Sequence, residues 1–378
     1  MRPSRLAFAS APIPFRSSFG HAAARRERAD NVLVLAEDEA GRFGIGEGCP
    51  RPYVTGETAD SARGFLEAHR RELSDVDGVP ALRDWMARRS AEIDLNPSAF
   101  CAVELALLDL FARQNGQSIE ALLGLSPLRS SLTTTAVYGT GSWAKFAGTA
   151  LLFAGNGMRE AKLKLGGDAG RDAQRAAILA KLGRVRLDAN NLWPSPAEAT
   201  AGLSPAARHA WAVEEPVRPR DWEGLREVSV RTGLAIILDE SFTRAADLEE
   251  APDDPPFIPN LRVSKLGGLL RSLDALRLAL EQGRTVIVGA QVGETSILAR
   301  AGMTLASAAA DRLVGFEGCY GTWLLEDAVT PSLRFGRRGR VDARKLSLWQ
   351  DGMGLSPSGS LERLRHVSGG RIEVERPT

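Results

Sequence analysis

Five charged residues follow successive strand-like runs of the sequence at nearly equal intervals. Neighbouring members of this series are 23 to 26 residues apart, the length of one strand-plus-helix unit, and they are Lys164, Asp188, Glu214, Asp239 and Arg262. Three of them are carboxylates, the hard oxygen donors that Mg²⁺ prefers, and no His or Cys closes these runs to favour Zn²⁺. The spacing therefore predicts a Mg²⁺ site that lies beside a basic side chain.

The segment KLK places two lysines on one face of a strand. Side chains alternate along a strand, so Lys162 and Lys164 point the same way. The positive charge of Lys162 and of a metal ion favours the neutral amine of Lys164, which is the form that accepts a proton. Such an amine can remove the α-proton of a carboxylate substrate, while the metal and Lys162 stabilise the resulting enediolate.

Two of the acidic motifs contain adjacent charged residues, of which only one can face the proposed metal. In VEEP we assign Glu214 as the ligand and leave Glu215 on the opposite face. In LDES we assign Asp239 as the ligand and Glu240 as a partner for a nearby cation.

The strands that must position these residues recur from Thr133 onward. Helical stretches such as GRDAQRAAILAKLG and RSLDALRLALEQG separate eight runs: TTTAVYG, AKLKLGG, VRLDANN, AWAVEEP, AIILDES, LRVSKLGG, TVIVGAQVGET and LVGFEGCYG. This alternation predicts an α/β fold, a closed (β/α)₈ barrel whose carboxyl strand ends open on one mouth. The five charged residues should converge there.

The chain on either side of the barrel has a different pattern. We predict an α+β capping domain over residues 1–130, with two strands in NVLVLAEDEAGRFGIGEG and a helix that begins at Asn96 and Pro97. The barrel should span 131–330. Residues 331–378 should return to the cap through the strand RIEVER.

Composition narrows the class of partner. Lysine and arginine total 48 against 47 acidic residues, and the net charge of +1 gives no field that attracts nucleic acid or an anionic membrane. The longest apolar runs are too short to span a bilayer, and three scattered cysteines favour a reducing, cytoplasmic compartment over a disulfide scaffold. A small-molecule substrate is the expected partner.

Together the motifs resemble the enolase superfamily, and most closely its muconate-lactonizing subgroup; the chain is similar to proteins of the mandelate racemase/muconate lactonizing enzyme type. The similar segments are GEGCPRPYVTGET and NPSAFCAVELALLDL in the cap, and KLK, LDAN, VEEP, LDES and KLGG in the barrel. Sites of this superfamily use a Lys or His base with Mg²⁺. The resemblance also implies a homo-oligomer.

The resemblance implies a role for each matched position. Lys164 matches the base, Lys162 its electrostatic partner, and Asn190 a residue that orients the first metal ligand. Asp188, Glu214 and Asp239 match the metal ligands. Segments that close over the substrate in similar proteins contain Arg16, Phe19, Tyr53, Thr55, Glu57, Glu294 and Thr295.

The chain departs from the subgroup on the sixth strand. Five positions before the Gly267–Gly268 pair the subgroup carries a second lysine, and this chain carries Arg262. Arginine stays protonated and is a poor base, which favours one-base dehydration or cycloisomerisation. Arg262 would then bind a substrate carboxylate or stabilise the enediolate, held by Glu240. Lys265 matches a basic position that similar proteins retain without using it as the base.

Two other functions remain open. An amino-acid or dipeptide epimerase needs a base on each face of the α-carbon, as it would have if Lys265 reached the mouth. A non-catalytic metal-binding barrel would result if Arg262 marks lost activity.

Overall fold

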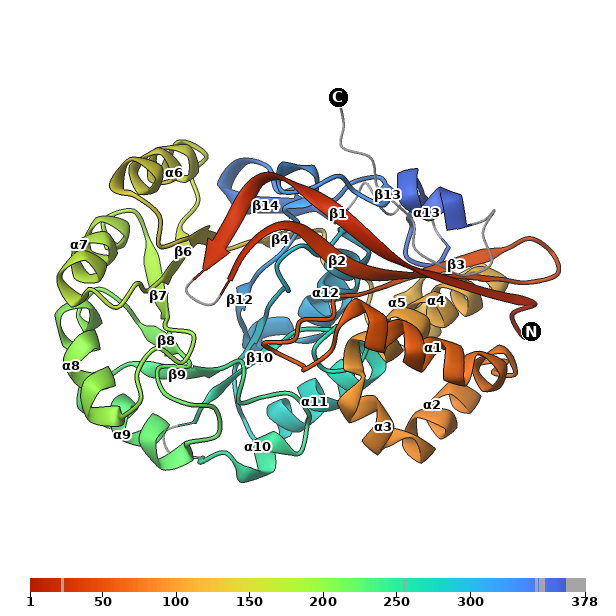
Figure 1. Cartoon of the computed structure of the whole chain (residues 1–378), viewed down its shortest axis with the longest axis horizontal. Helices are drawn as coiled ribbons and strands as arrows, with labels where there is room; N and C mark the ends of the chain where they lie inside the picture. Colours follow the sequence, from red (N-terminus) through yellow and green to blue (C-terminus); the bar gives the residue numbers. More distant parts are fainter. Residues whose placement is uncertain (22–23, 254–255, 344–345, 347–350, 365–378) are drawn as a thin grey trace.

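The computed structural model describes residues 1–21, 24–253, 256–343, 346 and 351–364. An eight-stranded parallel sheet with helices along it forms one part of the protein (Figure 1). An antiparallel three-stranded sheet with its own helices forms the other. The α/β barrel architecture with an N-terminal cap, expected from the sequence, is therefore present.

The parallel strands follow one another in chain order around the sheet. They are β5 (Ala136–Tyr138), β6 (Glu160–Lys164), β7 (Arg184–Asp188), β8 (Ala212–Glu214), β9 (Ala235–Leu238), β10 (Ile258–Leu261), β11 (Val286–Val288) and β12 (Leu313–Phe316). The amide of Thr135 donates to the carbonyl oxygen of Phe316 at 2.8 Å, which links the first strand to the last. In the register, Lys164 lies beside Asp188, and Asp188 beside Glu214. These side chains consequently end their strands at one level.

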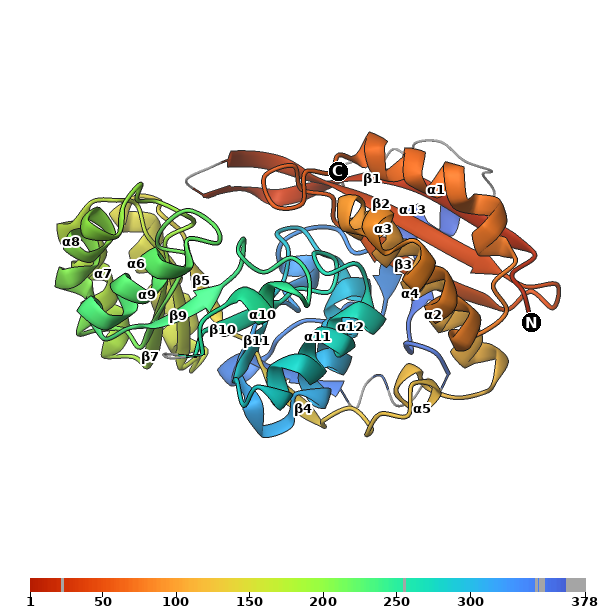
Figure 2. The ribbon, with the colours of Figure 1, turned by 90° about the horizontal axis from the view of Figure 1, so that it is seen from below.

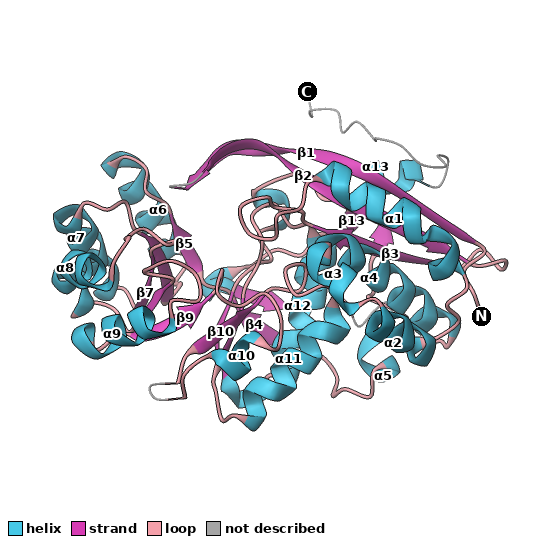
Figure 3. Cartoon of the chain, turned by 60° about the horizontal axis from the view of Figure 1, so that its bottom comes forward, coloured by secondary structure: helices cyan, strands magenta, loops and turns pink. Residues whose placement is uncertain are grey.

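Helices alternate with the strands and lie on the outside of the sheet (Figure 3). They are α6 (Trp143–Gly155), α7 (Ala169–Ala180), α8 (Pro196–Ala207), α9 (Trp222–Thr232), α10 (Asp247–Glu250), α11 (Leu269–Glu281) and α12 (Ser296–Ala308). The two helices expected from GRDAQRAAILAKLG and RSLDALRLALEQG correspond to α7 and α11. Apolar residues on one side of each, such as Leu179 and Leu276, are buried against the sheet.

The predicted sixth strand is wrong in position. The segment LRVSKLGG was expected to be the strand, but β10 ends at Leu261 and comprises mainly the preceding residues. Gly267 and Gly268 have φ angles of 82° and 106°, so the chain turns there before α11 begins. Arg262 still follows the strand end, as predicted.

The cap combines a sheet and five helices. The sheet contains β1 (Arg5–His21), β2 (Ala24–Glu37) and β3 (Phe43–Gly48); the helices are α1 (Ala59–Ser74), α2 (Val79–Arg88), α3 (Ser90–Leu95), α4 (Pro97–Gln114) and α5 (Ile119–Leu122). The hairpin of β2 and β3 and the helix at Pro97 confirm the sequence prediction. The β1–β2 ribbon reaches from the cap toward the β5–β9 side of the barrel (Figures 1 and 2).

Buried carboxylates of the cap join it to two barrel helices. Glu104 accepts hydrogen bonds from the amides of Leu269 and Leu270, at 3.0 and 2.7 Å, at the start of α11. Glu47 accepts from the amide and hydroxyl of Thr295 at the start of α12. These acids satisfy free amides at the positive ends of the helices, and so fix the orientation of the cap on the barrel.

The C-terminal segment contacts both parts. Strand β13 (Val329–Thr330) pairs with β15 (Ser356–Pro357), β14 (Arg340–Asp342) pairs with β4 (Ser131–Thr133), and α13 (Gly359–Arg363) follows. The amide of Met353 donates to Asp109 of the cap at 2.7 Å. The expected strand RIEVER lies outside the described residues, and the domain boundaries at 130 and 330 stay a prediction.

No helix in the described part of the chain is long and apolar enough to cross a membrane.

The contact between β3 and α4 gives a stability prediction. A Cβ atom on Gly46 would lie 1.9 Å from the carbonyl oxygen of Ala102, a backbone atom that cannot move aside. We expect Gly46→Ala to lower the free energy of unfolding by about 2 to 3 kcal/mol in urea denaturation, because the helix must shift outward. Gly64→Ala is the control: Gly64 is inside α1, and apart from its chain neighbours and the nearby backbone of its own helix, a Cβ atom there has no atom within 4 Å. That variant should be unchanged or slightly more stable, and equal losses in both would contradict the packing argument.

Candidate active site at the mouth of the barrel

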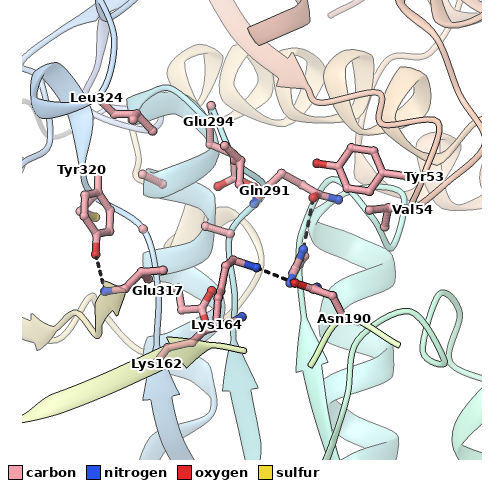
Figure 4. A pocket seen from close by; sticks show the side chains of 18 of the residues that line it. Tyr53, Val54, Lys162, Lys164, Asn190, Gln291, Glu294, Glu317, Tyr320 and Leu324 are labelled. Carbon is pink, nitrogen blue, oxygen red and sulfur yellow. Dashed lines mark hydrogen bonds and ion pairs between the residues drawn. The ribbon is translucent and has the colours of Figure 1, made fainter. Parts of the chain in front are cut away.

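A cavity of about 240 Å³ lies at the carboxyl ends of the barrel strands, next to the cap (Figure 4). Its polar wall carries charged and amide side chains: Lys162, Lys164, Asn190, Asn191, Glu240, Arg262, Gln291, Glu294 and Glu317. The remaining wall is largely apolar and includes Tyr53, Val54, Val137, Val292, Tyr320 and Leu324. The cavity therefore suits a small molecule with one polar end and one apolar end.

The three predicted ligand acids converge beneath this cavity, and Lys162 joins two of them. Its Nζ lies 3.1 Å from Oδ2 of Asp188 and 2.9 Å from Oε2 of Glu214. Burial lowers the pKa of Lys162, but the neighbouring carboxylates outweigh this and raise it above its ordinary value. Lys162 is accordingly a fixed cation rather than a base.

Arg262 joins the second pair of acids. Its Nη2 contacts Oδ2 of Asp239 closely and lies 3.3 Å from Oε1 of Glu214. Its Nη1 lies 3.2 Å from Oε1 of Gln291 on the cavity wall. Burial opposes the charge, but Asp239 and Glu214 outweigh it and raise the pKa of Arg262 further. The expected contact with Glu240 is not among the hydrogen bonds of the described residues.

Lys164 has both access to the cavity and a contact with an acid. Its side chain is 10 % exposed and lines the cavity wall. The Nζ atom donates to Oδ2 of Asp188 at 2.9 Å and to Oδ1 of Asn190 at 2.8 Å. Strand β6 thus presents an amine that touches both the acid cluster and the space for a ligand.

In the VEEP and LDES motifs, the second acid has different contacts from the predicted metal ligand beside it. Glu215 is buried and accepts hydrogen bonds from the amides of Asp239 and Ser241, both at 2.7 Å. It therefore fixes the loop after β9, while Glu214 faces Lys162 and Arg262. Glu240 lines the cavity, and Asn190 donates to it at 3.4 Å.

Lys265 does not reach the cavity. It is fully buried, and its Nζ donates to the carbonyl oxygens of Asp239 and Asn260 and to Oδ1 of Asp239, at 2.7 to 3.0 Å. All three of its hydrogens therefore have acceptors. The condition under which Lys265 would act as a second base is not met in this structure.

The pKa values of two of the predicted ligand acids, Glu214 and Asp239, are shifted in opposite directions. Burial raises the pKa of Glu214 to about 8, and repulsion from Asp188 and Asp239 adds to this despite the attraction of Lys162. Asp239 is also buried, but Arg262 and Lys265 outweigh burial and lower its pKa to about 2. Glu214, the middle acid, therefore has the least compensated charge of the three.

Sequence reasoning missed Glu317 and Arg186, which extend the charged cluster. Glu317 follows β12, lies 3.2 Å from Nζ of Lys162 and forms a close ion pair with the buried Arg186. The spacing series stopped at the sixth strand, so neither residue was considered. Continuing it to the end of β12, in LVGFEG, would have found Glu317.

Some of the predicted substrate-binding residues line the cavity in the structure, and others do not. Tyr53 and Glu294 line the cavity. Glu57 instead accepts hydrogen bonds from the amides of Ser98 and Ala99 at the start of α4, and Thr295 is buried against Glu47. Thr55 and Arg16 are not among the cavity-lining residues, and the side chain of Phe19 lies outside those described.

Comparisons with known proteins agree with this geometry. The sequence model of the family described as "Enolase C-terminal domain-like" matches residues 146–358. The chain belongs to this family. The fold and superfamily predicted from the sequence are thereby confirmed.

Individual relatives cover most of the chain. A hydrophobic dipeptide epimerase of Enterococcus faecalis is 28 % identical over 304 residues, covering 78 % of this chain and 84 % of that protein. The structure of a dipeptide epimerase from Cytophaga hutchinsonii, complexed with Mg and D-Ala-L-Val, matches with a TM-score of 0.84 at 22 % identity over 96 % and 98 % of the two chains. A 2-chloromuconate cycloisomerase from Rhodococcus opacus matches with a TM-score of 0.82 at 23 % identity over 98 % and 100 %.

The carboxylate oxygens at the site of this enolase-like chain are chemically suited to bind a divalent cation. Oδ1 of Asp188 is buried and has no hydrogen-bond partner among the described residues, and hard carboxylate oxygens are what Mg²⁺ prefers. No group of three or more His, Cys, Asp and Glu in the described part of the chain already has metal-binding geometry. In this structure Lys162 and Arg262 join the three acids through ion pairs.

The ion pairs of Glu317 give a pH-dependent prediction. Burial raises its pKa, but Lys162 and Arg186 outweigh this and lower it from an ordinary 4.5 to about 2. The ionised carboxylate therefore stabilises the fold fully above pH 4.5, and this stabilisation is lost as the pH falls from 4.5 toward 2. We expect Glu317→Gln to lower the free energy of unfolding at pH 7 by about 3 to 5 kcal/mol, because two buried cations lose a partner.

The measurement is urea denaturation of both proteins from pH 7 downward. The difference between wild type and Glu317→Gln should shrink below pH 4.5. The control is Glu227→Gln, which removes a half-exposed ion pair with Arg231 on α9 and should change stability by less than about 0.5 kcal/mol. A Glu317→Gln deficit that stays constant with pH would contradict the assignment.

Proposed function

We propose that the chain is a Mg²⁺-dependent isomerase or lyase that removes the α-proton of a small carboxylate. The observation that carries this proposal is the position of Lys164: its Nζ lines the cavity and lies 2.9 Å from Asp188, within the acid cluster. An amine, three neighbouring acids and a ligand-sized cavity are the parts that this reaction needs. The activities of the relatives are compatible with it.

The residues divide the work between proton transfer and charge stabilisation. Lys164 accepts the α-proton at Nζ, and Asn190, 2.8 Å away, orients that amine. Lys162 cannot act as the base because its pKa is raised, and its fixed charge stabilises the enediolate that forms. Asp188, Glu214 and Asp239 would hold the divalent cation, which would supply positive charge beside the substrate carboxylate.

Arg262 favours one-base chemistry. A guanidinium does not lose its proton at ordinary pH, so the sixth strand supplies no second base. Lys265 cannot replace it, because the three hydrogens of its ammonium group donate hydrogen bonds to oxygens of Asp239 and Asn260. Dehydration or cycloisomerisation, in which only Lys164 accepts the α-proton, is therefore the preferred reaction.

Dipeptide epimerisation is the second candidate. It is favoured by the similarity to the Enterococcus faecalis hydrophobic dipeptide epimerase and by the apolar part of the cavity wall, which could bind an apolar side chain. It requires a proton donor on the face of the α-carbon opposite Lys164. We also propose, as the sequence predicted, that the chain acts in the cytoplasm as a homo-oligomer on a small-molecule carboxylate.

Exchange of the α-proton with solvent deuterium tests the proposed function. We expect Lys164→Ala to reduce this exchange by about 10² to 10⁴-fold, because the amine that removes the proton is absent. The measurement is NMR of a panel of amino acids, hydroxy acids and dipeptides, including L-Leu-L-Tyr, in D₂O with Mg²⁺. Lys145→Ala, on the outside of α6 and away from the cavity, is the control and should exchange at the wild-type rate.

The products separate the candidates. Exchange without inversion at the α-carbon supports one-base chemistry, and exchange with inversion supports epimerisation. If the wild-type protein exchanges no member of the panel, or if Lys164→Ala exchanges as fast as wild type, the proposed function is wrong.

A further inference from the structure

Arg262 contacts two of the three carboxylates that would hold the divalent cation. Its Nη2 contacts Asp239 closely and lies 3.3 Å from Glu214. These two acids belong to adjacent strands, β9 and β8, so a cation held by both must share their oxygens with this guanidinium. A permanently charged group therefore competes directly with the ion.

The charged cluster is already balanced by its own side chains. We define it as the residues linked in one network of ion pairs: the cations Lys162, Lys164, Arg186, Arg262 and Lys265 and the acids Asp188, Glu214, Asp239 and Glu317. Five cations face four acids, and Glu240 beside them brings the total close to neutrality. A divalent ion alone would add two positive charges to a buried region, where uncompensated charge is costly.

Arg262 also has unused capacity to bind an anion. Its Nε is buried and has no hydrogen-bond acceptor among the described residues. The side chain lines the cavity and is held from the other side by Gln291 at 3.2 Å. A carboxylate in the cavity would supply the missing acceptor, because a guanidinium binds a carboxylate through two parallel hydrogen bonds.

We infer that Arg262 couples the binding of the divalent cation to that of the carboxylate substrate. Without a substrate, the guanidinium stays on Asp239 and Glu214 and weakens metal binding. A carboxylate in the cavity provides Arg262 with a new partner and offsets one of the two added charges. The metal therefore binds the substrate complex more tightly than the free chain, and the substrate binds the metal complex more tightly than the free chain. This inference rests on the proposed function for the identity of the ligands.

The coupling requires an arginine at position 262. A neutral side chain would release Asp239 and Glu214 from the guanidinium, so binding of the ion would depend less on the carboxylate. By linkage, the factor by which the carboxylate tightens metal binding equals the factor by which the metal tightens carboxylate binding. The effect is therefore measurable at equilibrium, without turnover.

Equilibrium dialysis of Mg²⁺ tests the inference. For wild type we expect weak binding of Mg²⁺ alone, and binding about tenfold tighter or more at saturating L-Leu-L-Tyr. The carboxyl-terminal amide of the same dipeptide lacks the carboxylate and should leave Mg²⁺ binding unchanged. Arg262→Met should bind Mg²⁺ alone about tenfold more tightly than wild type, and the dipeptide should tighten its Mg²⁺ binding by a smaller factor than in wild type.

Two further variants control for charge and folding. Arg277→Met removes an exposed arginine that pairs with Asp274 on α11, and it should bind Mg²⁺ as wild type does. Arg262→Lys keeps a positive charge at the site and should bind Mg²⁺ alone less tightly than Arg262→Met. Circular dichroism establishes that each variant is folded before dialysis.

Either of two results would overturn the inference: wild type binding Mg²⁺ alone as tightly as Arg262→Met, or Mg²⁺ binding to wild type that L-Leu-L-Tyr does not change. Neither result bears on Lys164, whose role is read from deuterium exchange. Failure of the coupling and failure of the proposed function are thus distinguishable.

Discussion

Repulsion between three carboxylates at adjacent strand ends is the constraint on which the arrangement of the site depends. Asp188 and Glu214 are buried side by side because the register of the parallel strands pairs them, and the buried Asp239 follows the end of the next strand, two residues beyond the partner of Glu214. In the structure two side-chain cations offset this repulsion, Lys162 between the first pair and Arg262 between the second. Lys164, the proposed base, shares Asp188 with Lys162, so the proposed chemistry of the cavity depends on how these charges are balanced.

The scaffold holds this cluster by using other buried acids as helix caps. Glu104 and Glu47 reach from the cap to the first amides of α11 and α12, and Glu57 does the same for α4 within the cap. Burial raises the pKa of Glu47 and of Glu104 to about 7. Buried acids therefore serve two purposes in this chain: those at strand ends face cations, and those at helix starts face backbone amides.

Much of the fold and the centre of the site could be predicted from the sequence because both depend on periodicity. The 23 to 26-residue spacing places one charged residue at the end of each of five strands, and a parallel barrel brings those ends together. Strand β1 was not predicted, since Pro12 and Pro14 interrupt its pattern. It pairs along its length with β2 and makes an isolated β-bridge from Phe15 to Leu325, and the outer side of an edge strand tolerates proline.

The surroundings of the site could not be predicted in the same way. Glu57 and Thr295 stand in segments that resemble substrate-closing loops, but a loop acid that caps a helix looks in sequence like one that binds a ligand. The contact of Arg262 with Gln291, rather than with Glu240, depends on side-chain directions that spacing does not fix. The sequence shows that Arg262 departs from the family pattern. It does not show which acids Arg262 contacts.

Diffraction from crystals grown with Mn²⁺ and L-Leu-L-Tyr is the most direct test of this account, because the anomalous signal locates the ion without assumptions about the reaction. The account predicts one strong peak at about 2.0 to 2.3 Å from oxygens of Asp188, Glu214 and Asp239, with the dipeptide carboxylate on Arg262 and the α-carbon within reach of Lys164 Nζ. The contrary result is an ion bound elsewhere, or no ion at the mouth, with Arg262 still joining Glu214 to Asp239.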